Sequence, residues 1–267
     1  MDTARLNSTV IEPLFDSWIA DLERRHLAEL TFPEVARALR ALSSTYVERR
    51  DRIAAGAALS GAGKRAAFAL FYGPLHFLVV HHVTDKLGLR PAPNVIDLGC
   101  GTGAAGAAFV SGKSGKPVRI LGIDRNPWAL GEAARTYRHF GAQAATRQAD
   151  AAASIARERG DARGGRRSIV AAFTINELAD EAREALLTRI LNGGRSRGDT
   201  VLIVEPIAKG VAKWWGRWAG AFEGAGGTAA EWRFAAELPG IVAKLDRAAG
   251  LDHRELTARS LSISRSA

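Results

Sequence analysis

Glycines and a carboxylate follow one short apolar segment at a spacing that suits a cationic ligand. The segment reads VIDLGCGTG over residues 95–103. Glycine has no Cβ, so Gly99, Gly101 and Gly103 allow a tight turn after a strand and a close approach of a ligand to the backbone. A carboxylate at Asp97 repels a pyrophosphate but attracts an ammonium or sulfonium group. The motif therefore favours a cationic amino-acid ligand over a dinucleotide.

Two further carboxylates follow the next two predicted strands. Asp124 lies 124 − 103 = 21 residues after Gly103, where an acidic side chain can accept both hydroxyls of a ribose. Asp150 follows the third strand, where its carboxylate can meet the amino group of an adenine. Their neighbours Arg125 and Ala151 are predicted as further contacts of the same ligand. The pattern also fits ordinary turn residues of another α/β protein.

These motifs resemble those of the class I S-adenosylmethionine (SAM)-dependent methyltransferases, over roughly residues 90–267. The match consists of residues 97–103, Asp124 and Asp150. The resemblance implies SAM as cofactor, methyl transfer as the reaction, and an α/β fold with a Rossmann-like, doubly wound, mostly parallel sheet. By the same resemblance, Phe173 and Tyr72 are expected to touch SAM, Tyr72 from a helix that folds over the cofactor.

The fourth predicted strand is followed by residues suited to a methyl acceptor. Asn176 can hold an amine or hydroxyl of the acceptor, and Glu177 can take its proton. The alternative is that both residues only cap the next helix. Glu205, at the end of the fifth strand, either binds substrate or makes a buried structural hydrogen bond.

The predicted secondary structure around these residues changes from helices alone to alternating strands and helices near residue 92. Residues 1–92 read as a helical subdomain, and residues 93–267 as the SAM-binding domain, because helical spacing gives way to strand–helix alternation. The predicted strands are residues 94–98, 118–123, 142–148, 168–173, 200–204 and 254–263. The last strand of the class I sheet is expected to be short or absent.

The amino-acid composition limits which classes of binding partner are expected. The 267 residues contain one cysteine, Cys100, and 37 basic against 28 acidic residues, a net charge of +9. The single thiol excludes an intramolecular disulfide. The basic excess favours an anionic partner such as RNA. No apolar run approaches the roughly 20 residues that span a bilayer, so a soluble, cytoplasmic protein without membrane contact is expected. The histidines do not form a metal set, and no metal is predicted.

A narrower resemblance concerns a methyltransferase-like family associated with the small ribosomal subunit. It rests on residues 38–43, the Pro74 segment, residues 176–178 and residues 204–206, and it implies ribosome association. Members of that family carry a cysteine set in the C-terminal half, and this chain has no cysteine after Cys100. Either the resemblance is general to class I enzymes, or this chain belongs to a branch of the family that lacks the cysteine set.

Three functions follow. The leading hypothesis is a SAM-dependent methyltransferase acting on ribosomal or other RNA. The alternatives are a ribosome- or RNA-binding assembly factor that keeps SAM as a structural ligand, and a small-molecule methyltransferase with a helical lid. The basic, tryptophan-rich segment 213–218 has three interpretations: packing against the sheet, stacking on bases, or a lid or partner surface.

Overall fold

The computed structural model describes residues 3–48, 59–112, 117–157, 165–207 and 212–264, and the chain divides into two compact units. The first unit contains residues 1–78 and 234–256, and the second contains residues 79–233 and 257–267. The sequence placed a single boundary at residue 92. The division differs because one helix continues across residue 78 and because residues 234–256 return to the N-terminal unit.

The first unit is helical. It comprises α1 (Thr3–His26), α2 (Phe32–Glu48), α4 (Ala62–Ala67), the π-helical turn η2 (Phe68–Tyr72), the first residues of α5 (Gly73–Lys86), and α11 (Gly240–Ala249). At the start of α2, the Thr31 N–H and hydroxyl both donate to the Glu34 carboxylate, at 2.8 and 2.7 Å.

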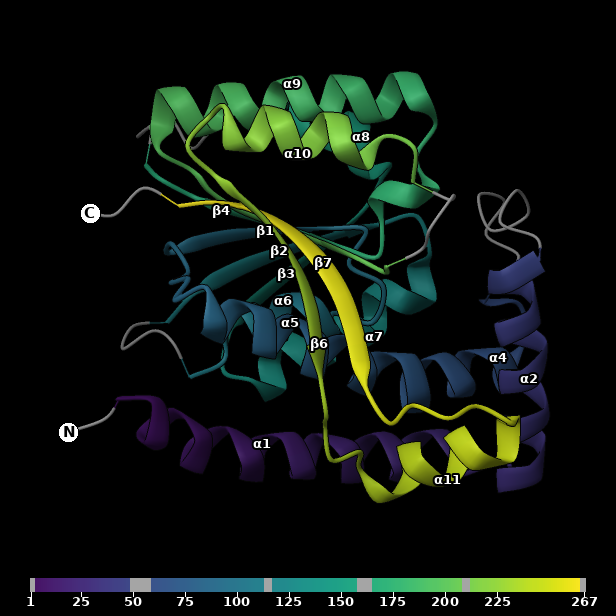
Figure 1. Cartoon of the computed structure of the whole chain (residues 1–267). Coiled ribbons are helices and arrows are strands. Elements are labelled where there is room, and N and C mark those ends of the chain that lie inside the picture. Colours follow the sequence, from purple (N-terminus) through teal and green to yellow (C-terminus); the bar gives the residue numbers. More distant parts are fainter. Residues whose placement is uncertain (1–2, 49–58, 113–116, 158–164, 208–211, 265–267) are drawn as a thin grey trace. The chain divides into compact units, whose positions relative to one another are not determined.

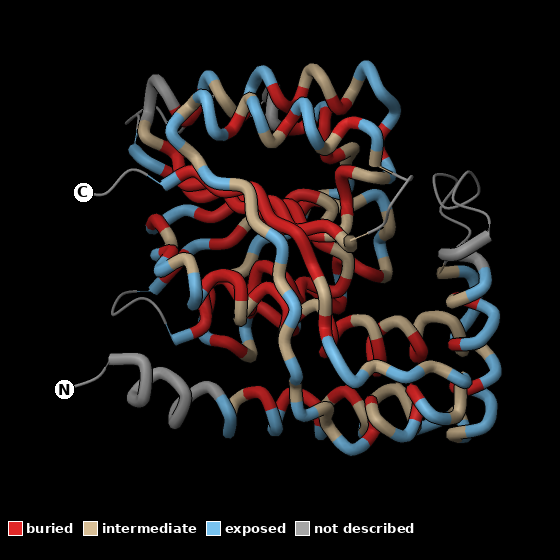
Figure 2. The backbone as a smooth tube through the Cα atoms, viewed as in Figure 1, coloured by how far each residue is buried: buried red, intermediate tan, exposed pale blue. Residues whose placement is uncertain are grey.

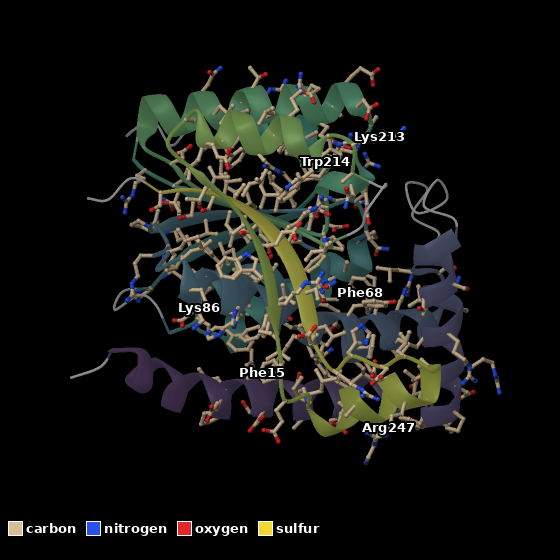
Figure 3. The ribbon with its side chains drawn as sticks, in the orientation of Figure 1. Phe15, Phe68, Lys86, Lys213, Trp214 and Arg247 are labelled. Carbon is tan, nitrogen blue, oxygen red and sulfur yellow. The ribbon has the colours of Figure 1, made fainter. Side chains whose placement is uncertain are left out.

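Aromatic rings form the core of this unit. Phe15, labelled in Figure 3, stacks on Phe77 at 4.9 Å between ring centroids, and Trp18 lies 5.7 Å from Phe77. Phe15 and Trp18 are three residues apart in α1, so they share one buried face of the helix.

A continuous helical stretch, Ala62–Lys86, carries the π-helical turn. The turn directly precedes Gly73 and Pro74. Proline lacks the N–H that an α-helix needs, so a local change of hydrogen-bond pattern before Pro74 has a direct cause. By length and composition alone this stretch could cross a membrane, but 72% of its apolar window is buried within the protein, as in a core helix.

The second unit is built on a seven-stranded sheet with the order β3-β2-β1-β4-β5-β7-β6 (Figure 1). The strands are β1 (Asn94–Leu98), β2 (Arg119–Asp124), β3 (Gln143–Gln148), β4 (Ser168–Ala172), β5 (Thr200–Glu205), β6 (Thr228–Phe234) and β7 (Leu256–Ile263). The first five pair in parallel, and β7 runs antiparallel to β5. A mostly parallel sheet with this strand order and with helices on both faces is Rossmann-like, so the predicted fold class is confirmed.

One strand was not predicted. Strand β6 lies at the edge of the sheet, and its residues alternate only between exposed and half-buried. A half-exposed edge strand gives little hydrophobic alternation, which explains why residues 228–234 were missed. The expectation that the last strand is short or absent was wrong, because both β6 and β7 are present.

Helices cover both faces of this sheet. Figure 1 shows α6 (Ala104–Val110) and α7 (Pro127–His139) on one face, and α8 (Ala151–Arg157), α9 (Asp180–Arg197) and α10 (Trp215–Glu223) on the other. The central strands β1, β4, β5 and β7 are largely buried (Figure 2). Trp214, Trp218 and Phe222 belong to the core beneath α10. Of the three interpretations of segment 213–218, packing against the sheet is therefore confirmed for Trp214 and Trp218.

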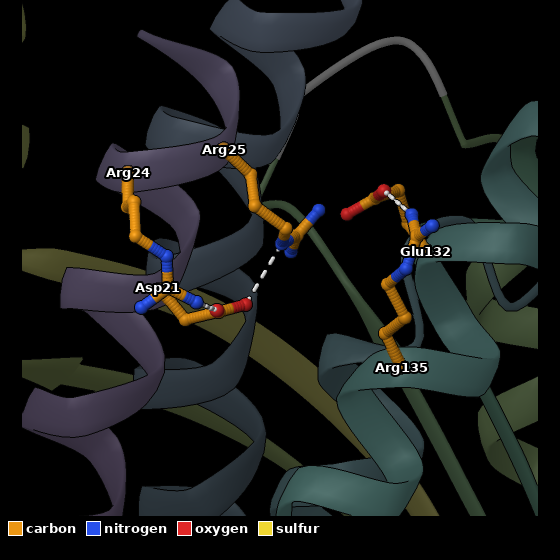
Figure 4. A network of polar contacts seen from close by, with 5 residues as sticks. All are labelled: Asp21, Arg24, Arg25, Glu132 and Arg135. Carbon is orange, nitrogen blue, oxygen red and sulfur yellow. Dashed lines mark hydrogen bonds and ion pairs between the residues drawn. The ribbon is translucent and has the colours of Figure 1, made fainter. Parts of the chain in front are cut away.

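Ion pairs between residues close in sequence lie along α1 and α7. Within α1, Asp21 pairs with Arg24 and with Arg25, and within α7, Glu132 pairs with Arg135 (Figure 4). Each pair is three or four residues apart, the spacing that brings side chains together on a helix. Arg24 and Arg135 are exposed, so their pairs with Asp21 and Glu132 each contribute roughly a few tenths of a kcal/mol.

Candidate functional site

Most of the predicted site residues lie at or just after the carboxyl ends of β1, β2, β3 and β4, and the strand order reverses between β1 and β4. The chain winds from β1 outward to β3, and then from β4 outward on the other side of β1. In such sheets, ligands bind outside the carboxyl ends of the strands at this reversal. The turn after β1 and the segment after β4 meet here, because the Thr174 hydroxyl donates to the Gly99 carbonyl at 3.1 Å.

The turn after β1 needs glycine. Gly99, Gly101 and Gly103 have φ values of +62°, +50° and +80°, in the left-handed region that other residues avoid. A Cβ at Gly99 would lie 2.3 Å from Thr174, and one at Gly103 would lie 2.8 Å from the Ala133 backbone. The glycines therefore serve both the turn and the tight packing around it.

Asp97 is buried behind this turn, with 1% of its surface exposed. Its Oδ2 accepts hydrogen bonds from the Gly106 N–H at 3.0 Å and from the Tyr137 hydroxyl at 2.8 Å. Its Oδ1 is buried and has no hydrogen-bond partner among the described residues. Burial raises the pKa of Asp97 to about 7, and the nearby Asp124 raises it further, against the two hydrogen bonds. The sequence did not anticipate the contact with Tyr137.

Asp124 holds the same turn from the end of β2. Its Oδ2 accepts the Gly101 N–H at 2.9 Å, and its Oδ1 accepts the Asn126 N–H at 2.8 Å. A carboxylate offers about four acceptor positions, so roughly two remain for a ligand. Asp97 and Asp124 thus flank one glycine turn, as the sequence predicts.

Asn126 fixes the start of the next helix. Its Oδ1 accepts the N–H groups of Trp128 and Ala129 at 3.0 and 3.2 Å, and Pro127 occupies the first helical position. Asn126→Ala should lower the free energy of unfolding by about 1 kcal/mol in urea titrations, because the cap is lost. Asn126→Ser is the control, since serine caps nearly as well. An equal loss in both variants would contradict the capping role.

Asp150 is engaged at the end of β3. One oxygen caps α8 through the Ala153 N–H at 3.0 Å, and the other pairs with Arg125. Burial acts to raise the pKa of Asp150, but the Arg125 and Ala153 hydrogen bonds lower it overall. The structure thus joins two predicted cofactor residues to each other, and Ala151 is buried in the first turn of α8. Their contact with an adenine stays a prediction.

Phe173 has a strained backbone at the end of β4. Its φ is +58°, and among the described residues it is the one non-glycine residue with positive φ. Such conformations cost about 1–3 kcal/mol and concentrate at functional sites. The Phe173 N–H donates to the Val204 carbonyl at 2.8 Å, which ties the strained residue to β5.

Glu205 organises the segment that follows Phe173. Its Oε1 accepts the N–H groups of Thr174 and Ile175 at 3.0 and 2.6 Å, and its Oε2 accepts the Asn176 amide at 2.7 Å. Burial raises the pKa of Glu205 to about 7, and the nearby Glu177 adds to the shift, against the backbone hydrogen bonds. Of its two predicted roles, the buried structural hydrogen bond is the one that the geometry supports.

Asn176 links Glu205 to Trp214. Its Oδ1 accepts the Trp214 indole N–H at 2.9 Å, while its amide nitrogen donates to Glu205. Neither Asn176 nor Glu177 caps α9, because they lie in a 3₁₀ turn and the N-cap residue is Ala179. The capping interpretation was therefore wrong. Glu177 is exposed, and the catalytic role of both residues stays a prediction.

Tyr72 belongs to the helical unit. It is half-buried in η2, its hydroxyl interacts with Ser43, and burial raises its pKa to about 12 against that hydrogen bond. Its ring lies 5.7 Å from Phe68 and 5.3 Å from Phe71, between centroids. The predicted contact of Tyr72 with SAM is not tested by this arrangement.

Comparisons with known proteins found resemblance to solved structures alone. No family model matches the chain, and the search of curated proteins found no match. Three solved structures are similar: the methyltransferase domain of bacterial CtHen1 (16% identity, 72% of this chain and 100% of that chain, TM-score 0.45), magnesium protoporphyrin IX methyltransferase from Synechocystis with bound SAM (15%, 90% and 99%, 0.43), and a cyclopropane-fatty-acyl-phospholipid synthase-like protein from Lactobacillus casei (13%, 74% and 94%, 0.48). At these identities the likeness concerns the fold alone.

Proposed function

We propose that this chain, whose sheet has the strand order of the class I SAM-dependent methyltransferases, binds SAM at the turn after β1 and transfers its methyl group. The observation that carries the proposal is the pair of carboxylates on one glycine turn. Asp97 keeps a buried oxygen without a partner, and Asp124 keeps acceptor positions at the end of β2. A buried unpaired acceptor is costly, and a cation supplies the missing partner.

Each polar group of SAM has a proposed partner among these residues. Its ammonium group would approach Asp97, and its ribose hydroxyls would donate to Asp124. Gly99 and Gly101 leave the backbone of the turn without side chains. When bound, SAM supplies a methyl carbon that its sulfonium sulfur makes electrophilic. The protein's part is to align the acceptor with that carbon, which needs little more than positioning.

Acceptor groups would meet the segment after β4. One amide hydrogen and one lone pair of Asn176 are not used by Glu205 and Trp214, so they are offered to an amine or hydroxyl. The nucleophile forms its bond to the methyl carbon as the carbon–sulfur bond breaks, and the sulfur keeps the electron pair. Glu177, exposed beside Asn176, is the base that takes the acceptor's proton.

Calorimetric titration of the full chain with SAM tests the cofactor. We expect one SAM per chain and no binding of NAD, since Asp97 disfavours a pyrophosphate at the turn. Absence of SAM binding by the wild type would end the proposal. S-adenosylhomocysteine, which lacks the sulfonium charge but keeps the ribose, should still bind.

For the acceptor we propose RNA, including ribosomal RNA, on the basis of the net charge of +9. Mass spectrometry of ribosomal RNA from a strain lacking the protein should show a missing methyl mark. A tritiated-methyl assay on cell extract separates the enzyme from an assembly factor that holds SAM structurally, because the factor labels nothing. Salt-sensitive RNA binding separates both from a small-molecule enzyme.

A further inference from the structure

A buried arginine lies across from Glu205 in the sheet. Arg259 of β7 is the register partner of Glu205 at the carboxyl end of β5, because these strands run antiparallel. Only 7% of its surface is exposed. Since Leu261 and Ile263, two and four residues along, belong to the core beneath α10, Arg259 faces that same side of the sheet.

The guanidinium of Arg259 is stacked but not hydrogen-bonded. Its central carbon lies 4.1 Å from the centroid of the Trp215 ring and 5.9 Å from that of Trp214. Its Nε and Nη2 are buried and have no hydrogen-bond partner among the described residues. Figure 3, which labels Trp214, shows this crowded region between α10 and the sheet.

The nearest carboxylates do not satisfy this group. Both oxygens of Glu205 accept hydrogen bonds from the segment after β4, and Arg259 forms no ion pair with Glu205 among the described residues. Burial lowers the pKa of Arg259, and Glu205 and Glu231 oppose that shift only through space. Two donors of a permanently charged side chain are therefore left for another partner.

Burying a cation without hydrogen bonds is unfavourable, and a partner for its two free donors would offset that cost. Guanidinium prefers carboxylate and phosphate, whose paired oxygens match two of its N–H groups. The contact with the Trp215 ring holds the guanidinium beside α10, 4.1 Å from the ring centroid. The arrangement suits a small oxyanion better than a neutral ligand.

Arg259 lies close to the residues that are proposed to bind the methyl acceptor. Trp214, which lies beside Arg259, donates to Asn176, the residue assigned to the acceptor above. We propose that Arg259 binds an anionic group, a phosphate or a carboxylate, of the methyl acceptor. This inference rests on the proposed function and adds the chemical class of the acceptor.

Titration of the full-length protein with inorganic phosphate and with acetate, at constant ionic strength, tests the proposal. We expect the wild type to bind one of these anions, and Arg259→Gln to bind it at least tenfold more weakly. Arg254→Gln, at an exposed arginine outside the site, is the matched control and should differ by less than twofold. Preference for phosphate indicates a phosphorylated acceptor or nucleic acid, and preference for acetate a carboxylic acid.

Two measurements keep the result interpretable. Arg259→Gln removes stacking on Trp215, so Arg259→Lys, which keeps the charge, is tested beside it and should retain more binding than glutamine. Absence of anion binding by the wild type, or equal binding by Arg259→Gln, would overturn the proposal. The same samples are titrated with SAM: binding of SAM without the anion refutes only the role of Arg259, and the reverse refutes only the cofactor.

Discussion

Replacing Asp124 with alanine should weaken SAM binding by about 100-fold or more. The carboxylate keeps roughly two acceptor positions beyond those used by Gly101 and Asn126, and two ribose hydroxyls can fill them. Hydrogen bonds to a charged group contribute about 1.5–3 kcal/mol each, so the loss of both exceeds the roughly 2.7 kcal/mol that corresponds to 100-fold. Calorimetry of both proteins with SAM measures the ratio directly.

Two companion variants separate binding from folding. Asp124→Asn keeps the shape and one acceptor oxygen, so it should lose affinity by an intermediate factor, about tenfold. Asp252→Ala changes an exposed aspartate outside the site and should leave SAM affinity unchanged. Because Asp124 also holds the Gly101 N–H, the melting temperature of each variant must be measured. A loss of less than threefold in a folded Asp124→Ala protein would remove Asp124 from the ribose site.

The carboxyl ends of the first three strands could be predicted because their signals are local. Asp97 and Asp124 each follow a short apolar run, and parallel strands bring such ends to one edge. The partners that arrive from elsewhere in the chain could not be predicted. Tyr137 meets Asp97 across 40 residues of sequence, and Arg259 meets Glu205 only because β7 inserts antiparallel beside β5.

The role of Asn176 also could not be predicted from the sequence. Its type and its place after β4 suggested either an acceptor contact or a helix cap. The hydrogen bond that it accepts comes from Trp214, 38 residues later in the chain, and the next helix begins only at Asp180, without a side-chain cap. Sequence patterns indicate helical spacing and the ends of strands. The hydrogen-bond partner of a buried amide such as Asn176 depends instead on which distant residue the fold places beside it.

Asp97 should make SAM binding depend on pH. Burial raises the pKa of Asp97 to about 7, so the free protein holds a proton there that an ammonium ligand displaces. SAM affinity should therefore rise by up to about tenfold per pH unit between about pH 5 and pH 7, roughly 100-fold in all, and then level off. Above about pH 8 the ligand's own amine loses its charge and affinity should fall again.

The same shift sets the sign of the stability change. A carboxyl whose pKa is higher in the folded than in the unfolded protein binds its proton more tightly when folded. Its contribution to the free energy of unfolding is thus present below about pH 4 and is lost as the pH rises to about 7. Urea titrations without SAM should show this loss in the wild type and a smaller loss in Asp97→Asn, where Glu205, whose pKa is also raised to about 7, still contributes.

Asp97→Asn should also flatten the binding profile at its low-pH level, since asparagine cannot ionise. Glu205 has a similarly raised pKa, so Glu205→Gln is the necessary comparison, and it should keep the slope. Titrations in two buffers of different ionisation enthalpy count the proton released on binding. If Asp97→Asn kept the wild-type slope, or if no proton were released near pH 6, the buried oxygen of Asp97 would not be the partner of the cation.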